Sequence, residues 1–279
     1  IHLSSPKNPV ISTESIFISN TAATANGGAV DSHHGNWVSI HDQFESNVAQ
    51  LGSGGAFSAF NSYVHFNTST SCSKNQALQG GGGCILWEPD ASSIEDVKWK
   101  ELEPVIHNLQ LATDNKAAYG AILATPAASL DVVRNSNTKM TTNNANLLAP
   151  EFPKVDILDF YGSVVQGDFA KDVEVDATLT ESTAKLFGAT TTKAGSSGRV
   201  FFNELGLQGV PGSGPHKMKF EAVLADSKRF LTTSALLSTW IQVCGENLYL
   251  DEKLQQCAKC PAGTTTRQQV GATNIDQCH

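Results

Sequence analysis

Three stretches of the chain repeat one pattern: FISNTAATANGGAV at residues 17–30, FESNVAQLGSGGAF at residues 44–57 and CSKNQALQGGGGCI at residues 72–85. Asn20, Asn47 and Asn75 stand in register within them, 27 and 28 residues apart. An Ala follows each Asn by two positions, and a Gly pair follows it by seven. A fixed period of this kind is the sequence signature of a repeat architecture, so it decides the fold of the first half.

Each copy has the features of one coil of a parallel β-helix. The period is too short for a propeller blade, and β-branched and aromatic residues lie between the glycines without helical periodicity. Stacked Asn side chains can bond from coil to coil, Gly supplies positive φ at a tight corner, and Ala fits a narrow interior. We therefore expect a ladder of Asn20, Asn47, Asn75 and Asn115, with turn glycines at Gly28, Gly55, Gly83 and Gly120.

A fourth and shorter copy, ATDNKAAYGAI at residues 112–122, keeps Asn115, Ala117 and Gly120. It follows an insertion around Trp87 to His107. Terminal repeats of a solenoid are often atypical because they cap it. We expect a β-helix of about four coils over residues 1–135.

The GGA(I/V/L) and FxxN motifs of residues 11–125 resemble the repeats of polymorphic outer-membrane proteins, whose passengers are right-handed β-helical surface adhesins. The resemblance implies a short right-handed β-helix and an adhesive role. The chain has too few coils for a full passenger of that family, so the resemblance does not imply outer-membrane anchoring.

The second half changes to short strands. The Asn- and Thr-rich residues 136–153 have the composition of a linker. Period-2 alternation follows, as in Val173, Val175, Ala177 and Leu179 and again in Met218, Phe220, Ala222 and Leu224, which predicts a β-sandwich over residues 154–243. The runs DFYGSVV at 159–165 and LFGATTTKAGSSGRVFFNELGL at 186–207 resemble bacterial-type Ig-like repeats, which usually act as spacers.

Six cysteines, an even number with local clustering, indicate an oxidising compartment. Cys72 replaces the Phe of FxxN and Cys84 replaces the Ala of GGA, so both should face the interior of the third coil. We expect one disulfide across that coil; the alternative is two free, buried cysteines.

The tail CGENLYLDEKLQQCAKCPAGTTTRQQVGATNIDQC at residues 244–278 resembles the cysteine-rich repeat of ephrin-receptor-like and tumour-necrosis-factor-receptor-like ectodomains, through CxxCPAGT. The resemblance implies a module at 244–279 with Cys244 bonded to Cys257 and Cys260 to Cys278. So short a module needs disulfides in place of a large core. The alternative is a reduced zinc site around the CxxC pair.

Charge and hydropathy exclude several partners. Only 16% of the residues are charged, the net charge is −8 and no Lys/Arg cluster occurs, so we expect no nucleic acid as a partner. No apolar run is long enough to span a bilayer, so we expect no membrane span. The chain begins at Ile1 without Met, as a fragment or processed chain would. We expect an extracellular or cell-surface location and no cofactor.

Several residue groups have a functional and a structural interpretation. The positions after the GGA motif are Asp31, Ser58, Leu86 and Leu123, and the acids Asp42, Glu45 and Asp90 lie at unrelated phases, so we expect no catalytic site. DSHHG at 31–35, with His41, could ligate a metal, but we favour a polar loop and expect no metal. Trp87 and Trp99 could stack on a sugar, although packing on the coils is the favoured interpretation. Asn67 begins an N-glycosylation sequon, so glycans are possible partners.

The sequence therefore predicts an extracellular structural or adhesive protein, a self-assembling subunit of a filament or surface appendage. A β-helix of few coils exposes strand edges at its ends, and the first coil is the edge more open to another chain. Self-association into a fibre or homo-oligomer is the expected consequence. The alternatives are a carbohydrate-active β-helix enzyme and a ligand-binding receptor ectodomain.

Overall fold

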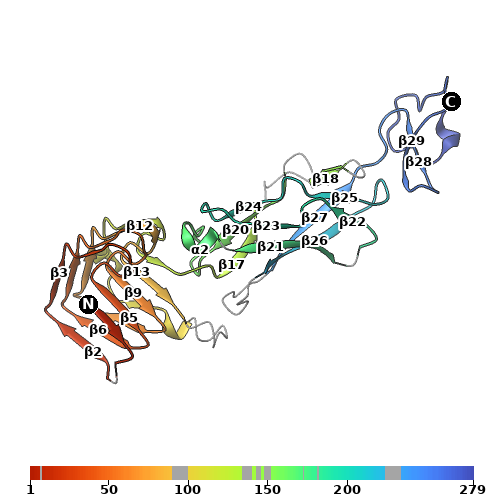
Figure 1. The fold of residues 1–279 in the computed structure, drawn as a ribbon. Helices are drawn as coiled ribbons and strands as arrows, with labels where there is room; N and C mark the ends of the chain where they lie inside the picture. The colour runs from red at the N-terminus through yellow and green to blue at the C-terminus, as the bar shows by residue number, and fades with distance from the viewer. Residues whose placement is uncertain are drawn as a thin grey trace.

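The molecule is elongated, and three parts follow one another along it (Figure 1). They are a parallel β-solenoid, a β-sandwich and a small module held by disulfides, so the structure is nearly all β, as predicted. The computed structural model describes residues 1–6, 8–89, 100–133, 140–142, 146–147, 152–171, 173–180, 182–223 and 234–279.

Four parallel sheets form the walls of the solenoid. The first sheet contains β1 (His2–Ser4), β5 (Val30–His33), β9 (Phe57–Phe60), β13 (Ile85–Glu88) and β16 (Leu123–Ala124). The second contains β2 (Val10–Thr13), β6 (Asn36–Ile40), β10 (Tyr63–Phe66) and β14 (Val105–Ile106). The third contains β3 (Ile16–Ile18), β7 (Gln43–Glu45) and β11 (Ser71–Ser73). The fourth contains β4 (Thr21–Ala22), β8 (Val48–Ala49), β12 (Gln76–Gly81) and β15 (Lys116–Tyr119).

Aromatic side chains stack on one another in the interior of the coils. The rings of Phe17 and Phe44 stack with centroids 4.6 Å apart, and those of Phe44 and Phe66 stack at 5.1 Å. Phe44 is fully buried, while its neighbours Gln43 and Glu45 on β7 are half-buried on the outer face. Ring pairs of this kind contribute about 0.5–1.5 kcal/mol beyond the burial of their area. The FxxN slot of the repeat is therefore a core position.

The two glycines of each pair have different tasks, which corrects the prediction for Gly28, Gly55 and Gly83. The first glycine takes the positive φ, as Gly54 does at +70°. A Cβ on the second would collide with the next coil, since on Gly55 it would lie 2.2 Å from the carbonyl oxygen of Gly83. The second glycine thus permits close backbone approach, whereas Gly120 of the fourth copy does have positive φ, at +58°.

The solenoid completes about three turns rather than four. In the fourth copy a short 3-10 helix, η2 (Leu109–Leu111), follows β14 at the point in the coil where a strand of the third sheet would stand. The copy still adds β15 and β16 to the stack. The predicted boundary at residue 135 is too late, because β17 (Ser129–Val132) pairs antiparallel with a strand of the sandwich.

The sandwich combines three sheets. One contains β17, β20 (Lys154–Leu158) and β24 (Arg199–Phe201). The second contains β18 (Met140–Thr142), β27 (Ser234–Ile241), β26 (His216–Val223), β21 (Glu174–Thr180) and β23 (Thr191–Lys193). The third contains β19 (Asn146–Leu147), β25 (Gly206–Gln208) and β22 (Lys185–Phe187). A short helix, α2 (Asp168–Lys171), precedes β21.

The alternating runs are inward-facing strands, as predicted. Val175 pairs with Ala222 and Ala177 with Phe220 across β21 and β26, and all four are buried. Leu224 lies outside the described residues. The predicted linker at 136–153 is wrong in part, because β18 and β19 within it pair with β27 and β25.

The last coil shares its core with the sandwich. Leu86, Tyr119 and Ala124 of the solenoid belong to the same buried cluster as Ile157 and Phe220 of the sandwich. Beside this cluster, Trp87 donates a hydrogen bond from Nε1 to the Tyr161 hydroxyl, 2.9 Å away, and packs edge-on against Phe160. The C-terminal end of the solenoid is thus covered by the chain itself.

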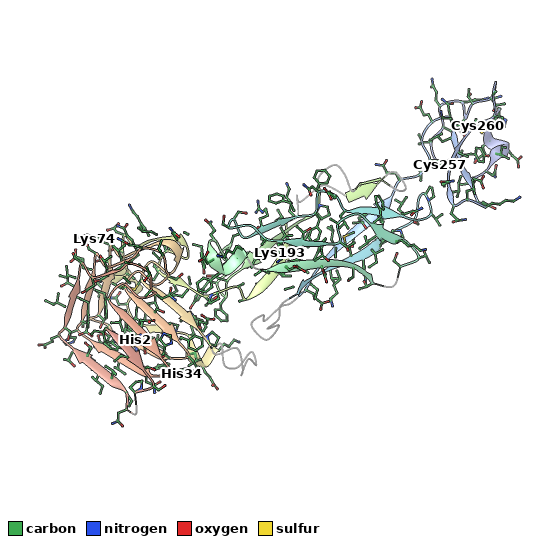
Figure 2. The ribbon with its side chains drawn as sticks, in the orientation of Figure 1. His2, His34, Lys74, Lys193, Cys257 and Cys260 are labelled. Carbon is green, nitrogen blue, oxygen red and sulfur yellow. A yellow bond between two sulfur atoms is a disulfide. The ribbon has the colours of Figure 1, made fainter. Side chains whose placement is uncertain are left out.

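The C-terminal module contains a hairpin of β28 (Leu248–Asp251) and β29 (Gln256–Lys259) and a 3-10 turn, η4 (Ile275–Gln277). Disulfides join Cys244 to Cys257 and Cys260 to Cys278, which are the expected pairs. Figure 2 shows Cys257 and Cys260 at the end of the molecule far from the solenoid. Because both sulfurs of the CxxC pair are in disulfides, they do not form the alternative zinc site.

Candidate functional site: the asparagine ladder and the open first coil

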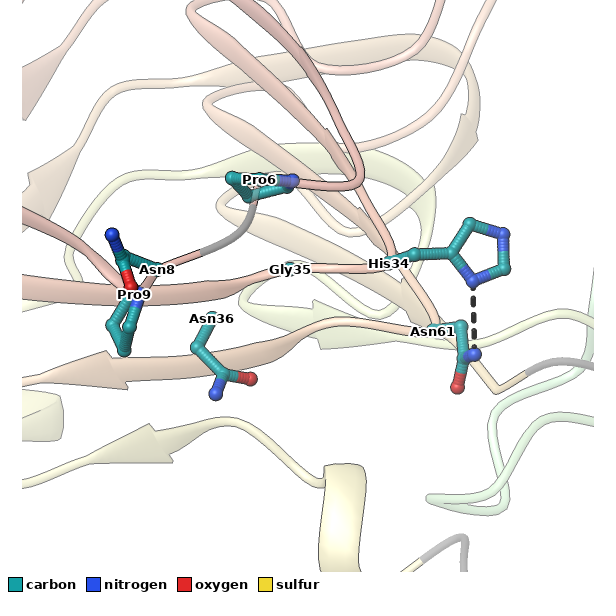
Figure 3. A pocket seen from close by; sticks show the side chains of 7 residues that line it. All are labelled: Pro6, Asn8, Pro9, His34, Gly35, Asn36 and Asn61. Atoms are coloured by element: carbon teal, nitrogen blue, oxygen red, sulfur yellow. Dashed lines mark hydrogen bonds between the residues drawn. The ribbon is translucent and has the colours of Figure 1, made fainter.

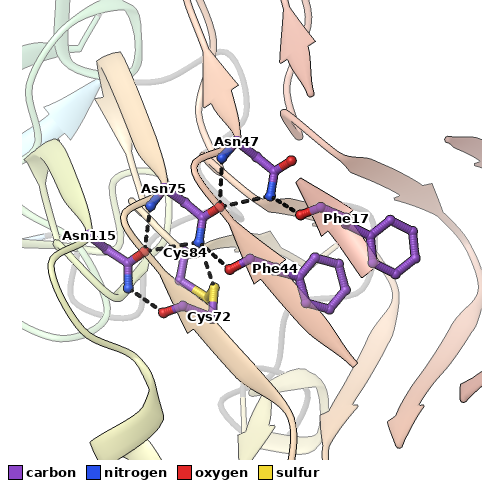
Figure 4. The surroundings of a disulfide bond; sticks show 7 residues. All are labelled: Phe17, Phe44, Asn47, Cys72, Asn75, Cys84 and Asn115. Atoms are coloured by element: carbon purple, nitrogen blue, oxygen red, sulfur yellow. Dashed lines mark hydrogen bonds between the residues drawn. A yellow bond between two sulfur atoms is a disulfide. The ribbon is translucent and has the colours of Figure 1, made fainter. Parts of the chain in front are cut away.

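A ladder of amide side chains runs through the solenoid (Figure 4). The Oδ1 of Asn47 accepts hydrogen bonds from the backbone N–H and the Nδ2 of Asn20, at 3.0 and 2.8 Å. Asn75 accepts from Asn47 in the same way at 2.9 and 2.8 Å, and Asn115 accepts from Asn75 at 2.9 and 3.1 Å. The four predicted residues therefore form one continuous chain of bonds.

Each inner rung also ties its side chain to a backbone carbonyl of the coil before it. Asn47 donates to the carbonyl of Phe17, and Asn75 to that of Phe44, at 2.9 and 3.0 Å. Asn47 and Asn75 are fully buried. A buried amide without partners costs about 1–3 kcal/mol, so this satisfied network fixes the register of each coil.

A disulfide between Cys72 and Cys84 crosses the third coil beside the ladder (Figure 4). Both residues are buried, and the Nδ2 of Asn75 lies 3.3 Å from the sulfur of Cys72. The two substituted slots of the repeat therefore face the interior, and the alternative of two free cysteines does not apply.

The ladder ends at an open N-terminal coil. Its strands β1, β2, β3 and β4 are the edge strands of the four sheets, with a neighbour on one side alone. Asn20 is exposed, and no rung precedes it within the described residues. The first coil therefore presents unpaired backbone and an amide rung to whatever lies next to it.

The outer face of this coil is also apolar where later coils are polar. Ile16 and Ile18 of β3 are 67% and 46% exposed. Their register partners are Gln43 and Glu45 in the second coil, followed by Ser71 and Ser73 in the third. Ile11 of β2 is also exposed, at 66%. The first coil thus combines an open edge with exposed isoleucine side chains.

DSHHG is not a polar loop, which corrects that prediction. Asp31 and His33 belong to strand β5, and His34 follows it. His41 is exposed in the turn after β6, where its backbone N–H donates to the Oδ1 of Asn67 at 3.3 Å. His41 and Asp31 therefore belong to different parts of the coil.

Asn67, the sequon residue, is half-buried in the turn after β10. Its Oδ1 accepts bonds from the backbone N–H of Ser69 and the hydroxyl of Thr70, at 3.2 and 3.1 Å. Thr68 and Ser69 beside it are exposed. The turn is thus ordered by the side chain that a glycan would modify.

A shallow pocket of about 200 Å³ lies at the turn between the first and second sheets (Figure 3). Its lining includes Pro6, Pro9 and the amides of Asn36 and Asn61. His34 lies at its rim, with Nδ1 3.1 Å from the Nδ2 of Asn61. Among the described residues, no acidic side chain lines this pocket.

Two acids of the solenoid, Asp42 and Glu45, have structural partners. Asp42 is buried, and it accepts bonds from the hydroxyl of Ser39 and the backbone N–H of Ser15. Glu45 pairs with Lys74 at 2.7 Å, and this hydrogen bond and charge lower the pKa of Glu45. Asp90 and Trp99 lie outside the described residues, and Trp87 is buried rather than a sugar platform.

One further acid lies at the junction with the sandwich. Asp159 is 1% exposed, and burial raises its pKa, although its Oδ1 accepts backbone bonds from Tyr161 and Ser163 at 3.0 and 2.7 Å. These bonds hold the turn that carries Phe160 and Tyr161 against Trp87. Sequence reasoning did not single out Asp159, whose DFYGS context has the pattern of an Asx turn.

No protein-family model, no curated protein and no solved structure matches the chain. Within the described residues, no helix is both long and apolar enough to cross a membrane. The three disulfides are compatible with a secreted protein.

Proposed function

We propose that the chain is an extracellular structural or adhesive protein that self-associates through its open first coil, as a subunit of a filament or surface appendage. The observation that carries this proposal is the contrast between the two ends of the solenoid. The C-terminal end shares a core with the sandwich, whereas the N-terminal end has four edge strands and exposed Ile16 and Ile18.

A second copy of the chain is the occupant that this surface fits. An edge strand binds another strand through backbone hydrogen bonds, and each isoleucine that becomes fully buried contributes about 1.5–3 kcal/mol. Because its own sandwich covers the last coil, a copy offers its first coil for the contact. Two first coils meet about a two-fold axis and form a dimer, and a fibre needs a second contact elsewhere.

The elongated arrangement and the disulfides support the structural role. Asp42 and Glu45, two acids that a carbohydrate-active enzyme could have used, are instead held by structural partners. An interface that supports a stable dimer buries at least about 1,000 Å².

Sedimentation velocity of the disulfide-bonded chain over a wide range of concentration tests the proposal. We expect concentration-dependent association, which the double substitution Ile16→Lys and Ile18→Lys abolishes by placing charges on the edge. Gln43→Lys, at the register position of Ile16 in the second coil, is the matched control and should associate normally. A wild-type chain that stays monomeric at the highest concentration, with no fibres by electron microscopy, contradicts the proposal.

A further inference from the structure

The outer face of the first sheet brings together two histidines and a carboxylate. His2 of β1 stands directly opposite Asp31 of β5 in the parallel register, and His33 follows Asp31 by two residues on the same face. The Oδ2 of Asp31 lies 2.9 Å from the Nδ1 of His2 and 3.1 Å from the Nε2 of His33. All three atoms lie within 4.8 Å of one another.

These separations are close to those of a tetrahedral metal site. Ligand atoms about 2.0–2.1 Å from a zinc ion are about 3.3–3.4 Å from each other. Both carboxylate-to-imidazole distances are within about half an ångström of that value. The side chain of His2 is 63% exposed, and its ring lies edge-on to the ring of His33, with the two centroids 5.2 Å apart.

The surroundings of the Asp31 carboxylate suit it to bind a metal ion. Its Oδ1 is buried and has no hydrogen-bond partner among the described residues, while its Oδ2 is directed at both imidazoles. The backbone on both sides is fixed, since β1 and β5 pair along their length and the N–H of Ser5 donates to the carbonyl of His33 at 2.8 Å. Ligands held on paired strands lose little freedom when an ion binds.

We propose that His2, Asp31 and His33 bind a divalent transition-metal ion of the zinc class, with water completing the coordination. Imidazole nitrogens suit zinc, cobalt and copper, whereas calcium and magnesium prefer sites made of oxygen. The ion fastens the edge strand β1 to β5. It therefore stabilises the first coil, and this role is independent of the proposed self-association.

Titration of the full, disulfide-bonded chain with Co²⁺, without a histidine tag, tests the site. We expect the visible absorption of tetrahedral cobalt, its displacement by Zn²⁺, and slower amide exchange in β1 and β5 with Zn²⁺ bound. Asp31→Asn and His33→Gln should each weaken binding at least tenfold. His34→Gln is the matched control, because its imidazole turns away to Asn61 and its loss should leave the affinity unchanged.

Two results overturn the proposal: no cobalt spectrum together with no calorimetric heat from Zn²⁺, or an affinity in Asp31→Asn and His33→Gln equal to that of the wild type. Circular dichroism of each variant shows whether the solenoid is intact. Asp31→Asn keeps the shape of the side chain, so a folded variant that no longer binds assigns the loss to the missing ligand charge.

Discussion

Replacing Asn47 by Ala removes a fully buried rung from the middle of the ladder. The side chain makes four hydrogen bonds, two through Oδ1 from Asn20 and two through Nδ2 to Phe17 and Asn75. The Oδ1 of Asn75 keeps the bond from the backbone N–H of residue 47, and the exposed Asn20 gains water instead. The carbonyl of Phe17 loses its side-chain donor. We expect a loss of about 1–3 kcal/mol, the cost of unsatisfied buried polar groups.

Hydrogen exchange followed by mass spectrometry measures the loss of stability around residue 47 locally. A single unfolding midpoint would be ambiguous, because the chain has several structural units. The N–H of Asn20 loses its acceptor in Asn47→Ala, and a loss of about 1–3 kcal/mol corresponds to exchange that is about 5- to 150-fold faster. Asn20→Ala is the control, because an exposed rung should change stability by about 0.5 kcal/mol or less. Equal effects of the two substitutions would refute the view that the ladder stabilises the coils through buried bonds.

Replacing Cys72 and Cys84 by Ala should lower the stability of the solenoid by about 2–4 kcal/mol, because the disulfide restricts the unfolded chain. Hydrogen exchange in the strands of the solenoid measures this loss, and unchanged exchange there would contradict the prediction. Gly55→Ala should cost about 3 kcal/mol or more, since its Cβ meets the backbone of the next coil, whereas Gly195→Ala meets nothing and should cost nothing. Burial raises the pKa of Asp159, so the folded state holds that proton more tightly than the unfolded state and stability falls as pH rises from about 4 through the raised pKa. Asp159→Asn should remove this loss of stability. Hydrogen exchange of the buried strands around residue 159, compared at about pH 4 and about pH 7 after correction for the intrinsic rates, measures it. An equal dependence on pH in both proteins would show the reasoning to be wrong.

The repeat made the solenoid predictable because equivalent residues perform equivalent tasks in each coil. Phe17 and Phe44 fill the same core slot, and Asn47 and Asn75 form the same rung, so three copies were enough to place them. Cys72 and Cys84 replaced residues in inward slots, which predicted their proximity.

Features that depend on pairing between residues far apart in the chain could not be predicted from the sequence. β17 continues from the last coil, yet it belongs to the sandwich because its partner β20 lies beyond the Asn- and Thr-rich stretch. That stretch looked like a linker, although short edge strands such as β18 and β19 have the same polar composition. His2 precedes the first repeat, and only the register of β1 against β5 places it beside Asp31.

The shared core of the last coil and the sandwich has a mechanical consequence. Tension applied along the chain reaches the solenoid through packed side chains such as Tyr119 and Phe220 rather than through a loose hinge. The solenoid and the sandwich therefore resist a pulling force as one unit. If the third coil unfolds under force, the disulfide between Cys72 and Cys84 prevents the chain between these residues from extending. Their sequence separation is 12 residues, which corresponds to about 40 Å of extended chain. The disulfide of the third coil thus limits how far the molecule can extend under force.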